Sequence, residues 1–578
     1  MRMQLRRTRS HAGRVTMKIG RREPAVTANF FRRNLKWFGV LILAFVIGLV
    51  FGILDWHEVI RRLQSAPGLV ARSVVPSDDL PTLAVDMSFT NYDGILGQRQ
   101  GALESGVYIP SAQDFVTATV RLDDAAVPVR MRLLAGPADH LGEDEKWGFE
   151  VRTRNNQLLL GMQRLYLLDP AVNNWLDQWA FSRALEREGV LVARYRFVHL
   201  IFNGDDRGIY ALQEGFGEEL LTTQGRPTGV IVEFDADLLW RSIAHFQGDA
   251  QAACADPVAN LSAADFQYFE VDPFRDATIA SDPDLSAQRD AAIGLLRALQ
   301  AGRLQASDVF DVEQYGRFLA STDLWGATEG TSLVNLRYYY NPVSARLEPV
   351  GFNANALGSD ARLSLAATYD DPTLQTAYVQ EAWRISQPEY LDELQSELEP
   401  EWRRLQRTLS ARTLKAEYEG LEPPWDALRR RQERIRRSLE PVQPVFAYLG
   451  SPTSTVSGTL RVDVANVLNL PVEIMGFDVH GATYLPVDRW WLKDESTELL
   501  TAHTDRVILR AFDSARTPVI RYAHFEIPLA EIHRLDNEFD FMQEVDIQVA
   551  TRILGLSTTH LTLAQRGYPD VFIGGAEK

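Results

Sequence analysis

The sequence predicts an α+β protein that has a single N-terminal transmembrane helix and ends in a β-sandwich-like domain. Three observations support this prediction. Residues 37–54 form an uncharged apolar run, residues 81–440 pass from two-residue to helical periodicity, and residues 441–578 return to short alternating segments. At roughly 100–200 residues per domain, a chain of 578 residues holds about two to four domains.

The N-terminal part is predicted to anchor the chain in a membrane. Residues 1–36 form a basic cytoplasmic segment with eleven Lys/Arg and one acidic residue, although the whole chain has a net charge of -17. The run 37–54 would be about 27 Å long as a helix, close to the thickness of the hydrocarbon core. The positive-inside rule then predicts a single-pass protein of the cell inner membrane. Its N-terminus would be cytoplasmic, and everything after the linker 55–80 would be periplasmic or extracellular. A cleaved signal peptide is the alternative.

Charge and cysteine content limit the partners. The lipid bilayer is the expected partner of residues 37–54, and the acidic remainder of the chain is expected to repel nucleic acid. Gly48 and Gly52 form a GxxxG pattern, which allows a dimer through the membrane helix. A single cysteine, Cys254, excludes an intramolecular disulfide and a cysteine-rich metal site.

Residues 81–215 are predicted to be β-rich with one helix. Val127, Val129, Met131 and Leu133 alternate with other residues, as in a half-buried strand. The stretch NNWLDQWAFSRALEREG, which follows Pro170, has helical spacing and stops at a glycine. The Asn-Gly pair in RFVHLIFNGDDRGIYALQEG is a strong hairpin signal.

Helices are predicted to dominate from residue 281 to residue 440. The candidates are residues 284–303, 307–325, 376–396 and 398–440, with a hairpin in NLRYYYNPVSARLEPVGF between the second and the third. The last candidate is expected to be broken by Pro423 and Pro424. Short alternating segments in the last 120 residues or so then predict a small β-sandwich.

Two stretches resemble the CotH kinase family, which is named for a spore-coat protein. Residues 140–240 contain HLGEDEKWGFEV, GMQRLYLLDP, NNWLDQWAFSRALEREGV and RYRFVHLIFNGDDRGIYALQEGF. Residues 311–358 contain DVEQYGRFLASTDLWGATEG and NLRYYYNPVSARLEPVGFNANALG. The order and number of these elements carry the resemblance, because the NG turn alone is merely a hairpin.

The resemblance implies a two-lobed, atypical kinase-like domain over residues 81–440. A small lobe at about 81–215 would hold ATP, and a helical lobe at about 216–440 would hold Mg²⁺. Lys146 resembles the nucleotide-facing lysine of the family, and Glu214 matches the glutamate at the lobe junction. Asn335 matches an asparagine that holds the metal. The residues themselves leave simpler roles open: a solvated lysine, a structural salt bridge and a turn-capping amide.

The chain departs from the family pattern at the metal site. Asn353 occupies the position of the metal-binding aspartate, and Asn355 stands where some members have a second one. Glu329 stands where relatives have a histidine or an acid, and it is the candidate catalytic residue. A neutral amide is a poorer Mg²⁺ ligand than a carboxylate and cannot act as a base.

These departures favour a degenerate kinase-like protein that acts in binding or scaffolding at the cell envelope. Its partner would be an envelope protein or a polysaccharide, and ATP and Mg²⁺ binding would be weakened or lost. Two alternatives stay open: an active ATP-dependent Ser/Thr protein kinase, and a module for polysaccharide binding or export.

Overall fold

The computed structural model divides the chain into two units, Met1–Pro76 and Ser77–Lys578. It describes parts of the second unit, and the ranges are 80–142, 146–236, 269–274, 276–359, 369–411, 421–450, 458–479, 483–493, 506–512, 520–535 and 546–566, with residues 240, 241, 244 and 363. The predicted basic segment, the run 37–54 and nearly all of the linker 55–80 lie outside these residues.

The prediction of a membrane-spanning protein is wrong for the described part of the chain. Among the helices of the described residues, none combines the length and the apolar character that a membrane crossing requires. The single-pass inner-membrane localisation therefore fails on the described part of the chain, and the segment on which it was based lies outside that part.

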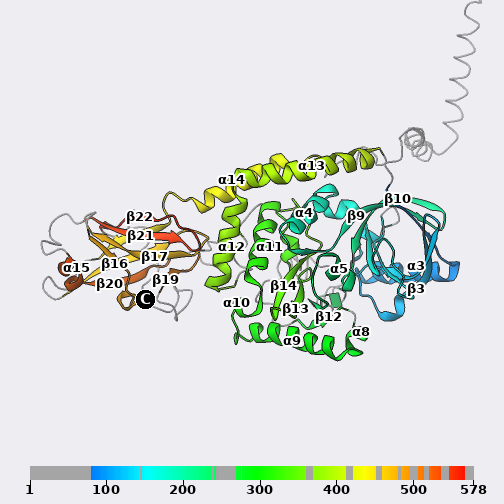
Figure 1. The fold of residues 1–578 in the computed structure, drawn as a ribbon, viewed down its shortest axis with the longest axis horizontal. Coiled ribbons are helices and arrows are strands. Elements are labelled where there is room, and N and C mark those ends of the chain that lie inside the picture. Colours follow the sequence, from blue (N-terminus) through cyan, green and yellow to red (C-terminus); the bar gives the residue numbers. More distant parts are fainter. Residues whose placement is uncertain are drawn as a thin grey trace, which may run out of the picture. The chain divides into compact units, whose positions relative to one another are not determined.

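The predicted fold class is also wrong for the first lobe. Within the described residues, seven strands close into a barrel (Figure 1). In barrel order they are β1 (Thr82–Asp86), β3 (Val116–Leu122), β4 (Ala125–Leu133), β6 (Phe149–Thr153), β7 (Arg164–Leu168), β10 (Asp205–Glu214) and β9 (Tyr195–Phe202). Strand β1 closes the ring because it pairs antiparallel with β3 and parallel with β9. The described chain is thus a mixed α/β protein built around a barrel rather than an α+β protein with a kinase-like small lobe.

The barrel interior follows the two-residue alternation. Val127, Val129, Met131 and Leu133 of β4 are buried in one apolar cluster with residues of the other strands. Helix α3 (Phe89–Ser105) packs beside β3, and β2 (Val107–Tyr108) pairs with β5 (Gly136–Pro137). The predicted β9–β10 hairpin is confirmed, and both residues of its turn, Asn203 and Gly204, have positive φ as the Asn-Gly signal requires.

A second sheet follows the barrel. Its order is β12 (Val271–Pro273), β11 (Ile231–Phe234), β13 (Arg337–Asn341), β14 (Arg346–Gly351) and β8 (Leu191–Val192). Strands β13 and β14 form the hairpin expected in NLRYYYNPVSARLEPVGF. Helices α4 (Leu176–Arg187) and α5 (Glu218–Thr223) connect strands of the barrel to strands of this sheet.

The helical part differs in its breaks from the prediction. Its helices are α8 (Asp276–Ala280), α9 (Pro283–Gln300), α10 (Ala306–Val309), α11 (Val312–Trp325), α12 (Pro372–Ile385), α13 (Pro388–Ser410) and α14 (Trp425–Leu439). The predicted break near residue 397 is wrong, because Pro388 begins α13 and Pro400 is accommodated inside it. A proline suits the first turn of a helix, where its missing N–H has no intrahelical partner.

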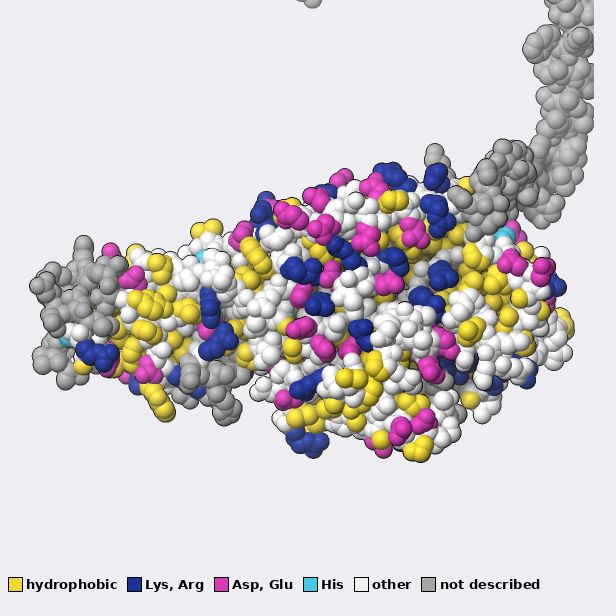
Figure 2. All heavy atoms as spheres, viewed as in Figure 1, with side chains coloured by type: hydrophobic (Ala, Val, Ile, Leu, Met, Phe, Trp, Pro, Cys, Tyr) yellow, Lys and Arg dark blue, Asp and Glu magenta, His cyan; other side chains and the backbone are white. Residues whose placement is uncertain are grey.

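Oppositely charged side chains cover α13 and α14. Figure 2 shows Lys/Arg and Asp/Glu side chains intermingled along this part of the surface. Neighbouring turns form ion pairs such as Arg436–Glu433 at 2.9 Å, and Arg429 pairs with Asp392 across the two helices at 2.8 Å. Such pairing is typical of a solvated helix face.

The C-terminal part consists of two small sheets. One contains β20 (Ala523–Pro528), β16 (Thr459–Asn466), β15 (Val445–Leu449) and β23 (Gln565–Arg566). The other contains β18 (Thr483–Pro486), β17 (Val472–Val479), β21 (Ile547–Ile553) and β22 (His560–Leu563), and β19 (Val507–Leu509) also pairs with β17. Residues of both sheets and of α15 (Leu529–Leu535) share one apolar core, as in a β-sandwich.

Candidate functional site

Four of the six predicted site residues meet around the β13–β14 hairpin. Asn355 Nδ2 donates to Glu329 Oε1 at 2.7 Å, and Asn335 Nδ2 donates to the Glu329 backbone oxygen at 3.0 Å. Asn353 Nδ2 donates to Asn335 Oδ1 at 3.3 Å. These side chains come from three different segments of the chain, so the hairpin is what brings them together.

The local backbone explains why these positions suit asparagine. Glu329 lies on the short 3-10 helix η5 (Thr328–Thr331), and Asn335 lies just before β13. Asn353 and Asn355 follow β14 and have φ values of 42° and 48°. Asparagine and aspartate enter this left-handed region more readily than other non-glycine residues. The conformation alone therefore does not distinguish an amide from the aspartate expected at Asn353.

One further member, Asn174, was missed by the sequence reasoning. It also has a positive φ, 55°, and it lies two residues before α4. Its Nδ2 donates to Asn355 Oδ1 at 2.9 Å and to the Ala356 backbone oxygen at 2.8 Å. We refer to Asn174, Glu329, Asn335, Asn353 and Asn355 as the amide cluster.

The amide cluster does not fit Mg²⁺. It offers one carboxylate, Glu329, and that carboxylate already accepts a hydrogen bond from Asn355. Nowhere in the described ranges do three or more His, Cys, Asp or Glu side chains gather in a way that would hold a metal ion. Mg²⁺ bound by proteins is usually held through carboxylates, and neutral amides do not balance its charge.

Lys146 is directed to an aromatic ring. It precedes β6, and its Nζ lies 5.6 Å from the ring centroid of Trp175. Trp175 directly follows Asn174 and is 2% exposed. A cation–π contact of this kind stabilises the ammonium group where it is. The structure thus joins Lys146 to the residue that follows Asn174, by a contact that the sequence did not predict.

Glu214 belongs to a different network. It ends β10, is 1% exposed and accepts from Arg194 Nη2 at 2.5 Å and from Arg194 Nε at 2.8 Å. Arg194 also donates to the Gly161 backbone oxygen at 3.0 Å. The structural salt bridge left open by the sequence is therefore the role that the geometry gives to Glu214.

Aromatic side chains fill the contact between the barrel and the second sheet. The ring centroids of Tyr166 on β7 and Phe352 are 5.9 Å apart, and those of Phe216 and Phe352 are 5.0 Å apart. The guanidinium carbon of Arg337 lies 5.4 Å from the Phe352 centroid and 5.6 Å from the centroids of Phe216 and Phe274. Arg337 also pairs with Glu233 at 2.6 Å. The two elements are thus held together by a packed aromatic group with a cation at its centre.

Asp177 is the second residue that the sequence reasoning missed. It lies in the first turn of α4, three residues after Asn174, and is 7% exposed. Its Oδ1 is buried and has no hydrogen-bond partner within the described residues. Burial raises the pKa of this carboxyl to about 8. It therefore holds its proton near neutral pH, unlike an ordinary surface aspartate.

Comparison with known proteins adds no family to this description. The chain matches no known protein family, and no curated protein is similar to it in sequence. The resemblance to the CotH kinase family therefore rests on the motifs quoted above and stays a prediction.

Proposed function

We propose that the chain, which carries sequence motifs resembling the CotH kinase family on a barrel-based fold, is non-catalytic and acts by binding or scaffolding rather than by phosphate transfer. The amide cluster is the observation that carries this proposal. Phosphate transfer requires carboxylates on Mg²⁺ and an oriented hydroxyl. Here the residues at the expected metal positions are amides that hydrogen-bond to one another and to Glu329.

The two residues expected at the nucleotide support the same proposal. Lys146 stacks on Trp175, and Glu214 is bound through both carboxylate oxygens to Arg194. Each group already has a partner in the free protein. An ATP phosphate would have to displace the first contact, and a charged ligand of Glu214 would have to break a buried ion pair.

The packing between the barrel and the second sheet is a third support. A nucleotide that bound between two kinase-like lobes would need room at this contact. Tyr166 and Phe216 are buried there and Phe352 is half-buried, with Arg337 among them. We therefore propose a protein or a polysaccharide, rather than a nucleotide, as the partner of this chain.

The proposal predicts that carboxylates can create the missing metal site. The double substitution Asn353→Asp with Asn355→Asp would place three carboxylates together, because both positions tolerate aspartate at positive φ. We expect the full-length double variant to bind Mn²⁺ at least about tenfold more tightly than the wild-type protein. Electron paramagnetic resonance of free Mn²⁺ during a titration measures this difference.

A matched control separates the site from a general effect of added charge. Asn155 and Asn156 are exposed and have φ values of 57° and 56°, so Asn155→Asp with Asn156→Asp adds the same two charges in the same backbone conformation. This control is expected to bind Mn²⁺ no better than the wild-type protein. Tight Mn²⁺ binding by the wild-type protein itself would contradict the proposal.

A further inference from the structure

Three arginines lie side by side on the outer surface of the barrel. In the register of neighbouring strands, Arg130 of β4 is opposite Arg152 of β6, and Arg152 is opposite Arg164 of β7. Their side chains point outward, because residues that alternate with them, such as Met131 and Val151, belong to the barrel core. We refer to Arg130, Arg152 and Arg164 as the arginine row. Like charges on directly opposite residues are unfavourable, so the row calls for a compensating anion.

Glu150 is the carboxylate that these arginines share within the described residues. Its Oε1 accepts from Arg152 Nε at 2.7 Å, and its Oε2 accepts from Arg132 Nε at 2.9 Å and Nη2 at 2.7 Å. Arg164 Nε is 4.0 Å from Oε1, beyond hydrogen-bonding distance. Arg130 is exposed and has no acidic partner in the described part of the chain. Four positive charges therefore face one negative charge, although the whole chain has a net charge of -17.

An aromatic ring holds part of this group in place. The guanidinium carbons of Arg132 and Arg152 each lie 4.4 Å from the ring centroid of Phe115, and that of Arg130 lies 5.8 Å from it. Such cation–π contacts fix the side chains before a ligand arrives, which lowers the entropic cost of binding. Arg152 Nη1 has no acceptor among the described residues, since Nε and Nη2 are the atoms that contact Glu150. It can therefore donate to a ligand.

The charges of the row disfavour one another. Burial lowers the pKa of Arg152, and the positive charge of Arg164 lowers it further. Glu233 of β11 also interacts with Arg164, but its carboxylate pairs with Arg337 at 2.6 Å. Counting that pair leaves the excess of positive charge unchanged. An anion over the row would reduce the repulsion.

The chemistry of the row favours an acidic segment of a protein as its ligand. Guanidinium groups bind carboxylates through paired N–H donors, and arginine clusters recognise acidic peptide segments. A sugar chain would gain from an open aromatic face, but the ring at this row, Phe115, already contacts guanidinium groups. We propose that the arginine row docks an extended acidic segment of a partner protein, whose carboxylates contact Arg130, Arg152 and Arg164. The choice of a protein over a polysaccharide narrows the proposed function and rests on it.

Protection of individual arginines from phenylglyoxal, measured by mass spectrometry of the full-length protein, tests this site. A readout for each residue is needed because the basic segment 1–36 also attracts acidic peptides. We expect a hexaglutamate peptide to slow the modification of Arg130 by about threefold or more, and salt to remove this protection. Hexaglutamine should have no effect.

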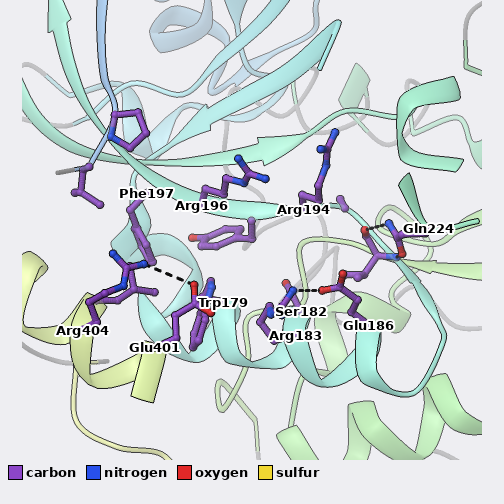
Figure 3. A pocket seen from close by; sticks show the side chains of 16 residues that line it. Trp179, Ser182, Arg183, Glu186, Arg194, Arg196, Phe197, Gln224, Glu401 and Arg404 are labelled. Carbon is purple, nitrogen blue, oxygen red and sulfur yellow. Dashed lines mark hydrogen bonds and ion pairs between the residues drawn. The ribbon is translucent and has the colours of Figure 1, made fainter. Parts of the chain in front are cut away.

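Arg196 of β9 is the matched control residue. It is exposed, it has no acidic partner among the described residues, and it lines a separate cavity that none of the row's arginines lines (Figure 3). Its modification is expected to stay unchanged with hexaglutamate. In the variant Arg152→Gln the protection of Arg130 should fall by about half or more, because the middle contact of the row is lost. If this variant does not fold, the wild-type comparison of Arg130 with Arg196 still decides.

Four results would overturn the inference. Hexaglutamate leaves Arg130 unprotected, hexaglutamine protects it equally well, or Arg196 is protected as strongly as Arg130. The fourth is that hexagalacturonate, which has the same number of carboxylates, protects Arg130 better than hexaglutamate does, since a polysaccharide would then be the better ligand. None of these results depends on phosphate transfer, so failure of this inference is distinguishable from failure of the proposed function.

Discussion

Replacing Glu150 with glutamine is expected to lower the free energy of unfolding by about 3–5 kcal/mol, the usual cost of removing one partner from a buried ion pair. Glu150 lies on the outer face of the barrel and is 5% exposed. Its carboxylate lies 2.7 Å from Arg132, 2.6 Å from Arg152 and 4.0 Å from Arg164. Glutamine keeps the shape of the side chain but leaves three guanidinium groups without their shared negative charge.

The pH dependence of this effect has a definite sign. Burial by itself raises the pKa of Glu150, but the attraction of Arg152, Arg132 and Arg164 outweighs it and lowers the pKa below the ordinary value of 4.5. The stabilisation by this carboxylate is therefore present above the unfolded-state pKa and is lost as the pH falls through the folded-state pKa. The difference between the wild-type protein and Glu150→Gln should shrink in acid.

Urea unfolding at pH 7 measures the Glu150 effect. Glu433→Gln is the control, because Glu433 pairs with Arg436 and Arg437 at the exposed surface and its removal should leave the midpoint unchanged. If Glu150→Gln unfolds at the same urea concentration as this control, the arginine cluster around Glu150 does not stabilise the barrel in the way described.

Replacing Asp177 with asparagine is expected to raise stability above neutral pH by an amount on the order of a few kcal/mol. Burial raises the pKa of Asp177 from 3.8 to about 8 in the folded protein. The folded chain therefore keeps a proton that the unfolded chain releases. The contribution of this group to stability is complete below the unfolded-state pKa and is lost as the pH rises toward and through about 8.

Thermal or urea unfolding of both proteins between pH 4 and pH 9 measures the Asp177 effect. The advantage of Asp177→Asn should grow with pH across this range. Asp205→Asn removes an exposed aspartate of β10 and should keep the pH dependence of the wild-type protein. If the stability of the wild-type protein and that of Asp177→Asn changed with pH in the same way, Asp177 would be ionised in the folded chain and would have a partner. That result would contradict the prediction.

Single strands and turns could be predicted from the sequence better than the closure of the barrel or the breaks between helices. The alternation of Val127, Val129, Met131 and Leu133 is a local property of one strand, and so is the Asn203-Gly204 turn. Closure of the barrel depends on β1 pairing with β9, more than a hundred residues away, and no local pattern records that pairing. The break near residue 397 was misplaced because Pro400 is tolerated inside α13, whereas the break expected at Pro423 and Pro424 lies directly before α14.

The residues of the candidate site could be predicted from the sequence where they fall within one of the quoted motifs. Glu329, Asn335, Asn353 and Asn355 were selected by their places in motifs, and the β13–β14 hairpin does bring them together. Asn174 was missed because the stretch before α4 carries no signal for a contact 181 residues away. The burial of Asp177 is set by tertiary packing, which the sequence does not display.

Phosphate transfer from ATP labelled at its γ-phosphate tests the central claim most directly. The full-length protein would be incubated with ATP and Mg²⁺ or Mn²⁺, alone and with casein as an acceptor, beside a Lys146→Ala variant as the background control. We predict that the wild-type protein transfers no more label to itself or to casein than this variant does. Label that depends on the metal and disappears in Lys146→Ala would contradict the account, because the amide cluster would then support catalysis.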